Sequence, residues 1–351
     1  MGLTRVIEEL VDERDLDRAI LADIIIEGML AGYKKRYPEL DLKVEFDKSS
    51  GKLDVSIQKE VVSRVEDEDI QISLRKARNL NSKIDVGKKI WLPFEKPIGR
   101  VEILKAKQVI AQRIRAVEAQ GVYDNFKDKK GSIVQGVVYK GERGGTLVKL
   151  QDSLAFLPNS LSIPGEPLQL GYPVKALLKD VLEEPCNENQ LIIDRSSDMF
   201  LKKLFESEIP EVFEGLVEIQ KIVRDPGYKS KVVVGSNDVN IDPVGTCVGV
   251  GGARIKPILK ELGGEKIDII LSSSNKESLV RGSLKPAEIN RVEILNDVAR
   301  VWLNDDQRSL AIGKMGKNIT LASRLVGLGI ELVENDINDG QDLVIDEKFK
   351  E

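Results

Sequence analysis

The sequence predicts an α+β protein of several domains, and three observations carry this expectation. At 351 residues the chain is long enough for two or three ordinary domains, each with its own core. Near residue 127 the pattern changes from helical spacing to short β-rich runs separated by Gly, Pro, Asn and Asp. In the last third of the chain, a glycine-rich loop and its flanks recur 64 residues apart.

Residues 1–126 predict a helix, a hairpin and a longer helix. Leu16, Ile20 and Ile24 recur at i, i+4 spacing, which indicates an amphipathic helix capped by Asp15. The segments "LKVEF" and "LDVSI" alternate apolar and polar residues around the turn "DKSSGK", as a β-hairpin does. Residues 104–126 return to helical spacing, and their basic side chains fit either a solvated helix exterior or a binding surface.

Residues 127–199 contain five short β-rich runs, which predicts a small barrel of the OB type. Barrels of this type stack bases on exposed aromatic rings. The strands here offer only Tyr139, Phe156 and Tyr172, and in so small a domain an aromatic side chain belongs to the core at least as often. The barrel alone is compatible with binding a single strand and does not establish it.

The composition argues against an enzyme. The chain has no histidine, so the commonest general base and the commonest metal ligand are both missing. Its two cysteines, Cys186 and Cys247, form no disulfide framework, which fits a reducing compartment. It has no run of about 18 apolar residues and no apolar core of a secretory signal. We therefore expect a cytoplasmic protein with no membrane segment, no catalytic residue, no metal and no cofactor.

The first glycine cluster, in "DPVGTCVGVGGARIKPILKEL", fits neither common nucleotide motif. A dinucleotide fingerprint would need a third glycine where Arg254 stands, and no phosphate-binding Gly-Lys-Ser/Thr loop occurs in the chain. What remains is Gly-x-x-Gly, Gly249-Val250-Gly251-Gly252, followed by a helical pattern. In a KH domain such a turn between two helices brings backbone N–H groups close to the sugar-phosphates of about four nucleotides.

One Gly-x-x-Gly can also be a structural helix cap, so its repetition matters. Gly313-Lys314-Met315-Gly316 aligns with the first loop, and the apolar positions and the following strands, "KIDII" and "GIELV", align with it. This repeat predicts two KH domains. The charge gives weak support: residues 229–333 carry a net charge of +3 within a chain of net charge −5.

Longer stretches then resemble one family. "LKKLFESEIPEVFEGLVEIQKIVRDPGYKSKVVV", "DPVGTCVGVGGARI", "ELGGEKIDII" and "DDQRSLAIGKMGKNITLASRLVGLGIEL" closely resemble the NusA family of bacterial transcription elongation, termination and antitermination factors. The resemblance implies an N-terminal α/β polymerase-binding domain at 1–126 and an S-one-type OB-fold RNA-binding barrel at 127–199. It further implies two tandem type II KH domains at 200–280 and 281–346, and a short charged tail at 347–351.

The resemblance also implies partners and a role. We expect binding to the RNA polymerase core through residues 1–126, to single-stranded nascent RNA, and to other transcription antitermination factors, by a monomer. The role would be to modulate pausing, intrinsic termination and antitermination. The RNA-binding residues expected in the two KH loops are Gly249, Val250, Gly251, Gly252, Arg254, Gly313, Lys314, Met315, Gly316, Lys317 and Asn318.

Two departures from the family pattern shift the balance between the loops. Family members commonly carry a basic residue where this chain has Gly251, so the first loop must rely on backbone N–H groups, with Arg254 behind it. Lys317 replaces the glutamine usual after the last glycine of the second loop, which adds a charge. We therefore expect the second loop to contribute more to RNA affinity than the first.

Two other readings of the same modules stay open. Polynucleotide phosphorylases also join KH and S-one-type domains, but in the opposite order and behind large catalytic domains that this chain lacks. A ribosome-associated KH protein would sediment with ribosomes rather than with polymerase. Phosphorolysis of poly(A) and co-sedimentation separate these readings from a transcription factor.

Overall fold

The structure, a computed structural model, describes residues 18–47, 52–81, 83–151, 153–186 and 189–334. The chain divides into two compact units: the first ends at Val122 and the second begins at Tyr123. Among the described residues, no helix has both the length and the apolarity that a membrane span requires.

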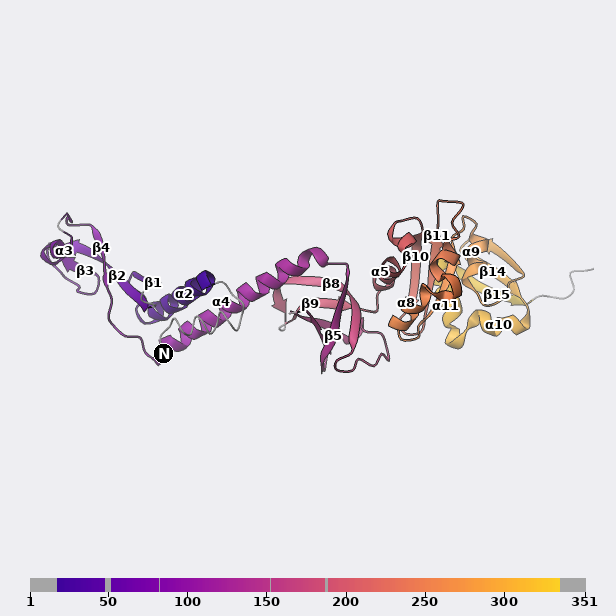
Figure 1. Ribbon diagram of the computed structural model, residues 1–351, viewed down its shortest axis with the longest axis horizontal. Coiled ribbons are helices and arrows are strands. Elements are labelled where there is room, and N and C mark those ends of the chain that lie inside the picture. Colours follow the sequence, from indigo (N-terminus) through magenta and orange to yellow (C-terminus); the bar gives the residue numbers. More distant parts are fainter. Residues whose placement is uncertain (1–17, 48–51, 82, 152, 187–188, 335–351) are drawn as a thin grey trace, which may run out of the picture. The chain divides into compact units, whose positions relative to one another are not determined.

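The first unit is a four-stranded sheet with two long helices (Figure 1). Strand β2 pairs antiparallel with β1 and β4 and parallel with β3, and the predicted hairpin is confirmed as β1 and β2. The elements are α2 (Arg18–Arg36), β1 (Leu42–Asp47), β2 (Lys52–Val62), β3 (Gln71–Ser73), α3 (Leu74–Leu80), β4 (Lys89–Pro93) and α4 (Arg100–Phe126).

The apolar face of α2 differs from the predicted one. Leu21, Ile24 and Ile25 are buried against Ile114 of α4, whereas Ile20 is 41% exposed. Because apolar residues lie on several sides of "AILADIII", spacing alone could not choose between Ile20 and its neighbour. The other two residues of that prediction, Leu16 and the cap Asp15, lie outside the described residues.

The second unit begins with a closed barrel whose strand order is β5-β6-β7-β9-β8, as expected for an OB-type fold. Its strands are β5 (Ile133–Glu142), β6 (Gly145–Leu150), β7 (Ser153–Pro158), β8 (Pro173–Cys186) and β9 (Asn189–Asp194). Tyr139 and Tyr172 are exposed, whereas Phe156 is half-buried.

Two KH domains follow. The first begins with two helices and the second with one, and each continues with two strands, two helices and a strand. In each three-stranded sheet an antiparallel hairpin is followed by a third strand parallel to the middle one, as in the type II arrangement. The first contains α5 (Asp198–Glu208), α6 (Pro210–Phe213), β10 (Glu218–Asp225), β11 (Lys229–Gly235), α7 (Pro243–Val248), α8 (Ile255–Glu261) and β12 (Lys266–Leu271). The second contains α9 (Lys276–Ser283), β13 (Arg291–Leu295), β14 (Val298–Leu303), α10 (Asp305–Ile312), α11 (Lys317–Val326) and β15 (Gly329–Glu334).

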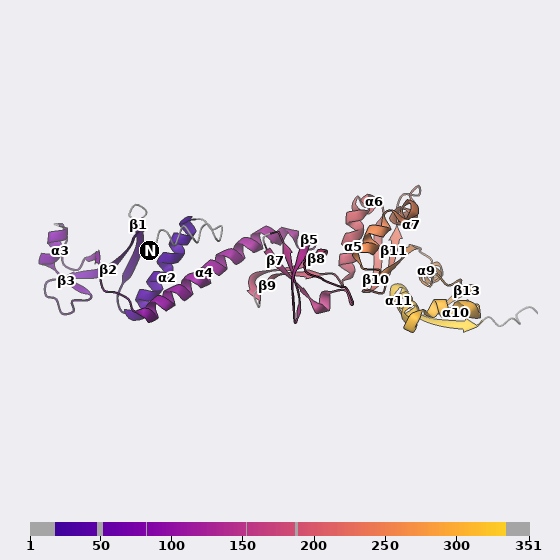
Figure 2. The same cartoon turned by 60° about the horizontal axis from the view of Figure 1, so that its bottom comes forward.

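The two KH domains pack against each other through α11, which lies beside β10 in Figures 1 and 2. Leu321 and Leu325 of α11 are buried in one cluster with Val223 and Val233 of the first sheet. Lys221 on β10 donates from Nζ to the carbonyl oxygen of Leu325 at 2.5 Å, where the negative end of the helix dipole favours a cation. The two KH domains therefore form one packed body.

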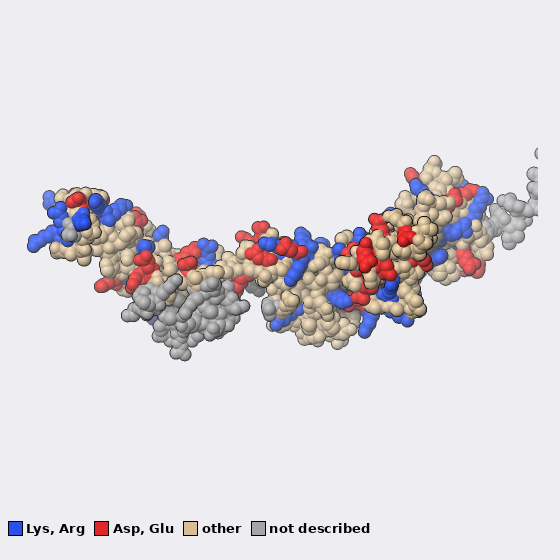
Figure 3. Space-filling model, turned by 45° about the horizontal axis from the view of Figure 1, so that its top comes forward, with Lys and Arg blue, Asp and Glu red and all other residues tan. Residues whose placement is uncertain are grey.

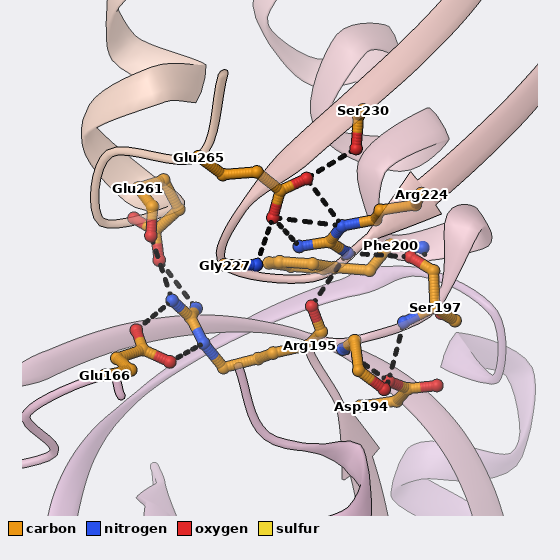
Figure 4. Close-up of polar contacts among 11 residues, drawn as sticks. Glu166, Asp194, Arg195, Ser197, Phe200, Arg224, Gly227, Ser230, Glu261 and Glu265 are labelled. Carbon is orange, nitrogen blue, oxygen red and sulfur yellow. Dashed lines mark hydrogen bonds and ion pairs between the residues drawn. The ribbon is translucent and has the colours of Figure 1, made fainter. Parts of the chain in front are cut away.

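A network of buried charges joins the barrel to the first KH domain (Figure 4). The fully buried Arg195, which follows β9, donates from Nε to Glu166 Oε2 at 3.0 Å and from Nη1 to Glu261 Oε1 of α8 at 2.7 Å. Behind it, Arg224 Nη2 lies 2.8 Å from Glu265 Oε2, and neither side chain is exposed. Such a pair is costly to desolvate, and removing one partner leaves a buried uncompensated charge.

Candidate nucleic-acid interface

The first Gly-x-x-Gly loop joins α7 to α8 through a backbone that only glycine adopts easily. Gly249, Gly251 and Gly252 have φ values of 74°, 60° and 79°. A Cβ on Gly249 would lie 2.9 Å from Cγ of Arg254, so glycine is required there for space as well as for φ. Nothing lies within 4 Å of a Cβ on Gly251, where only the backbone angle favours glycine.

The second loop, between α10 and α11, follows the same path. Gly313 and Gly316 have φ values of 72° and 73°, and a Cβ on Gly313 would lie 2.6 Å from Cβ of Asn318. Met315 occupies the position equivalent to Gly251 with a φ of 54°. A left-handed angle costs a non-glycine residue roughly 1 to 2 kcal/mol.

The tips of both loops face solvent. Val250 is 97% exposed and Met315 is 85% exposed, and Lys314 is exposed beside it. On the face shown in Figure 3, acidic side chains gather over the first KH domain and basic side chains over the second. The loops therefore present one apolar and one cationic tip to a ligand.

Arg254, one of the expected RNA-binding residues, is engaged with the protein. Its Nη1 donates to the carbonyl oxygen of Thr246 at 2.9 Å, and its Nη2 donates to Oε1 of Glu211 at 2.8 Å. The backbone N–H of Glu211 and the Arg254 guanidinium both hold the pKa of the Glu211 carboxyl below its usual range. Arg254 thus lies behind the loop, as expected, but its charge is neutralised there.

Lys317 and Asn318 are likewise directed into the protein. Lys317 Nζ lies 2.6 Å from Asp225 Oδ2 and 4.4 Å from the ring centroid of Tyr228, both in the first KH domain. Asn318 is only 3% exposed, because its side chain fills the space between α10 and β11. The charge that Lys317 adds beside the second loop pairs with Asp225 of the first KH domain, and its contact with RNA stays a prediction.

The structure also brings together residues that the sequence did not reveal as a group. A hollow of about 760 Å³ lies between the first sheet and the second loop. Lys229, Lys266, Lys285 and Lys314 are among its lining residues, together with Asp268. These residues lie on four separate segments, so no local motif marks them, and the hollow extends the basic surface of the second loop.

Charge within this hollow is partly balanced. Lys229 and Lys231 both contact Oδ2 of Asp268, at 2.7 Å and 2.8 Å. Burial lowers the pKa of Lys231, and the charge of Asp268 opposes that shift. Lys266, Lys285 and Lys314 add further positive charge, which favours a polyanion over a neutral ligand.

Comparison with known proteins agrees with this architecture. Three family models match the chain: the NusA N-terminal domain at residues 2–120, the NusA-like first KH domain at 195–272 and the NusA-like second KH domain at 276–339. A transcription termination/antitermination protein NusA from Thermus thermophilus is 34% identical, over 96% of this chain and 92% of its own length. The protein of the same name from Bacillus subtilis is 33% identical, over 91% of this chain and 87% of its own.

A third relative with this name, from Rickettsia conorii, is 34% identical over 94% of this chain and 67% of its own length. The similarity runs through both units rather than through one module. With its domain order, its paired KH loops and relatives of this identity and coverage, the chain belongs to the NusA family.

Proposed function

We propose that this protein is an RNA-binding transcription factor that acts in termination and antitermination. The KH loops and the barrel would hold single-stranded nascent RNA, residues 1–126 would bind the RNA polymerase core, and together they would modulate pausing and intrinsic termination. One observation supports this most: the same glycine-walled turn occurs twice, with exposed tips, in two KH domains that form one body.

Two KH loops on one body favour a single strand as the ligand. Each loop offers backbone N–H groups and a helix start to phosphates, and each alone binds weakly. Joining two weak sites raises the effective affinity without new contacts. Exposed Lys314 adds a charge-assisted contact in the second loop, and we propose that this loop contributes the larger share.

The remaining parts of the proposal follow the same line. We propose that other antitermination factors are its partners, that the protein is a monomer, and that it acts in the cytoplasm. We propose no catalytic activity; in the part of the chain that the structure describes, no group of three or more Cys, Asp or Glu side chains could hold a metal ion. Incubation with poly(A) and phosphate should release no nucleoside diphosphate.

The RNA surface is tested by Lys314→Asp/Met315→Asp in the full chain. The two carboxylates would stand where phosphates are expected, while Gly313 and Gly316 keep the turn. For every phosphate of a single strand that the protein no longer neutralises, the slope of log affinity against log salt should fall by about 0.7. Lys314→Arg is the matched control and should bind as wild type does. A folded double variant with wild-type affinity and slope would rule out this loop as an RNA clamp.

The polymerase contact is tested by removing residues 1–126. We expect the shortened protein to keep RNA binding and to lose binding to the polymerase core in a pull-down. Circular dichroism checks that the barrel and KH domains stay folded. Polymerase binding at full strength by this variant would refute the role proposed for the first unit.

A further inference from the structure

One position is used in the same way in both KH loops. Arg254 and Asn318 each lie two residues after the last glycine of the loop. Arg254 Nη1 donates to the carbonyl oxygen of Thr246 at 2.9 Å, and Asn318 Nδ2 donates to that of Leu310 at 3.2 Å. In both cases the acceptor lies eight residues earlier. Two different side chains thus make the same connection.

The accepting carbonyls belong to the helix that enters each loop. Thr246 lies near the end of α7 and Leu310 near the end of α10. The last carbonyls of a helix have no partner within it and need one elsewhere. Asn318 also donates to the carbonyl oxygen of Ala311 at 3.1 Å, which extends this support by one residue.

The same two side chains form the inner wall of the loop. A Cβ on Gly249 would meet Arg254 Cγ at 2.9 Å, and one on Gly313 would meet Asn318 Cβ at 2.6 Å. The start of each loop therefore lies directly on this side chain. Hydrogen bonds on one side and close packing on the other fix the loop between two helices.

The second anchor of each side chain differs. Arg254 donates to Glu211 of α6, within its own KH domain, at 2.8 Å. Asn318 Oδ1 accepts from Lys229 Nζ of β11, in the first KH domain, at 3.1 Å. Lys229 is itself held by Asp268 at 2.7 Å. The first loop is thus anchored within its own domain, and the second loop is anchored to its neighbour.

We propose that Arg254 and Asn318 are positioning residues for the two Gly-x-x-Gly loops, and that Asn318 makes the order of the second loop depend on the first KH domain. This inference rests on the proposed function, because loop order affects RNA affinity only if the loops bind RNA. A loop already held in its bound conformation loses less entropy on binding. Neither side chain needs to touch RNA for this effect.

Salt dependence distinguishes the loss of a cationic phosphate contact from the loss of loop order. Removal of a phosphate contact lowers the salt slope, whereas loss of loop order lowers affinity at an unchanged slope. Asn318→Ala in the full chain should weaken binding to a single-stranded RNA oligonucleotide roughly tenfold, since buried carbonyls lose their donor. Its slope should equal that of wild type. Wild-type affinity in a folded Asn318→Ala variant would overturn the proposal.

Hydrogen exchange without RNA tests loop order independently of the proposed function. Arg254→Met keeps the aliphatic stem beside Gly249 and removes the donors, so amides of residues 249–253 should exchange faster. Arg254→Lys keeps a donor and should restore slow exchange in part. If Arg254→Met and Asn318→Ala both stay folded and each leaves its own loop exchanging as in wild type, the proposal is wrong.

Substitution of the two anchors, Glu211 for Arg254 and Lys229 for Asn318, tests each loop separately. Glu211→Gln should speed exchange at 249–253 only, and Lys229→Met should speed exchange at 313–317 only, although residue 229 lies in the first KH domain. Faster exchange in neither loop would overturn the proposal. Should these shifts occur while Lys314→Asp/Met315→Asp leaves RNA binding unchanged, the positioning would be upheld and the RNA-clamp function would fail.

Discussion

The two KH loops share a backbone and differ in chemistry. The φ values of equivalent residues are 74° and 72° at the first glycine and 60° and 54° at the third position, although that position is Gly251 in one loop and Met315 in the other. The exposed second position is Val250 in one and Lys314 in the other. The turn is therefore fixed by its two outer glycines and by the side chain behind it, while the tip is free to set affinity.

The KH domains also differ in how they are held. The first is joined to the barrel by buried contacts, including the Arg195–Glu261 ion pair and the hydrogen bond from Arg224 Nη1 to the carbonyl oxygen of Arg195. The second rests on the first through α11 and through Asn318. The barrel therefore holds the first KH domain, and the first KH domain holds the second. A substitution that disturbs the first KH domain should also loosen the Gly-x-x-Gly loop of the second.

The largest effect we expect comes from the buried pair. Arg224→Met leaves the Glu265 carboxylate buried without its guanidinium and should lower the free energy of unfolding by about 3 to 5 kcal/mol. The exposed pair of the second KH domain, Arg300 and Glu331 at 3.5 Å, is the matched control. Arg300→Met should cost about 0 to 1 kcal/mol. Urea unfolding measures both, and equal costs would contradict the contrast between the domains.

A lysine at position 250 gives the first loop the charged tip that the second loop has at Lys314, and tests whether that charge sets RNA affinity. Val250→Lys should raise affinity for single-stranded RNA several-fold and increase the salt slope by about 0.7, because one phosphate contact is added. Val250→Gln is the neutral control and should change neither quantity. No gain from the lysine would mean that RNA does not pass the first loop within reach of this position.

Substitutions at the third position of each loop, Gly251 and Met315, test whether the two turns have the same backbone conformation. Gly251→Ala should lower the free energy of unfolding by about 1 to 2 kcal/mol through its φ alone, since a Cβ there meets open space. Met315→Gly should cost little or raise stability, because relief of the strain at φ 54° offsets the cost of a more flexible unfolded chain. Thermal unfolding of both variants measures these opposite effects. A destabilising Met315→Gly together with a neutral Gly251→Ala would show that the two turns are not equivalent.

The smallest effect concerns Cys247, whose equivalent in the second KH domain is Ala311; both are fully buried. Burial raises the pKa of the Cys247 thiol to about 11. A raised thiol pKa contributes stability that is present below the unfolded pKa, about 8.5, and is lost as the pH rises toward 11. The stability difference between wild type and Cys247→Ala should therefore shrink from pH 8 to pH 10 in thermal unfolding. A difference that grows over this range would contradict the burial of the thiol.

Local sequence patterns were sufficient for the elements and their order. Alternation predicted the hairpin of β1 and β2, five β-rich runs predicted the barrel, and the repeated glycines predicted two loops of one shape. Helical spacing was less decisive where apolar residues crowd together, which is why Ile20 was placed on the wrong face of α2. The proposed domain bounds at 126, 199 and 280 stay predictions.

The contacts of charged and amide side chains could not be read from the sequence. Lys317 and Asn318 follow the loop directly, so proximity suggested RNA. Each has a partner about 90 residues away on the first KH domain: Asp225 for Lys317 and Lys229 for Asn318. Arg195 and Arg224 have no local signal for burial, because the carboxylates that pair with them come from other segments. Long-range pairing decides which basic side chains remain for a ligand.

We propose that both KH loops hold the same RNA strand. Hydrogen exchange of the full chain, with one single-stranded RNA oligonucleotide present, tests this. We predict that amides of residues 249–253 and 313–317 become protected together, at the same RNA concentration. Protection of one loop alone, or protection at two separate concentrations, would contradict the account.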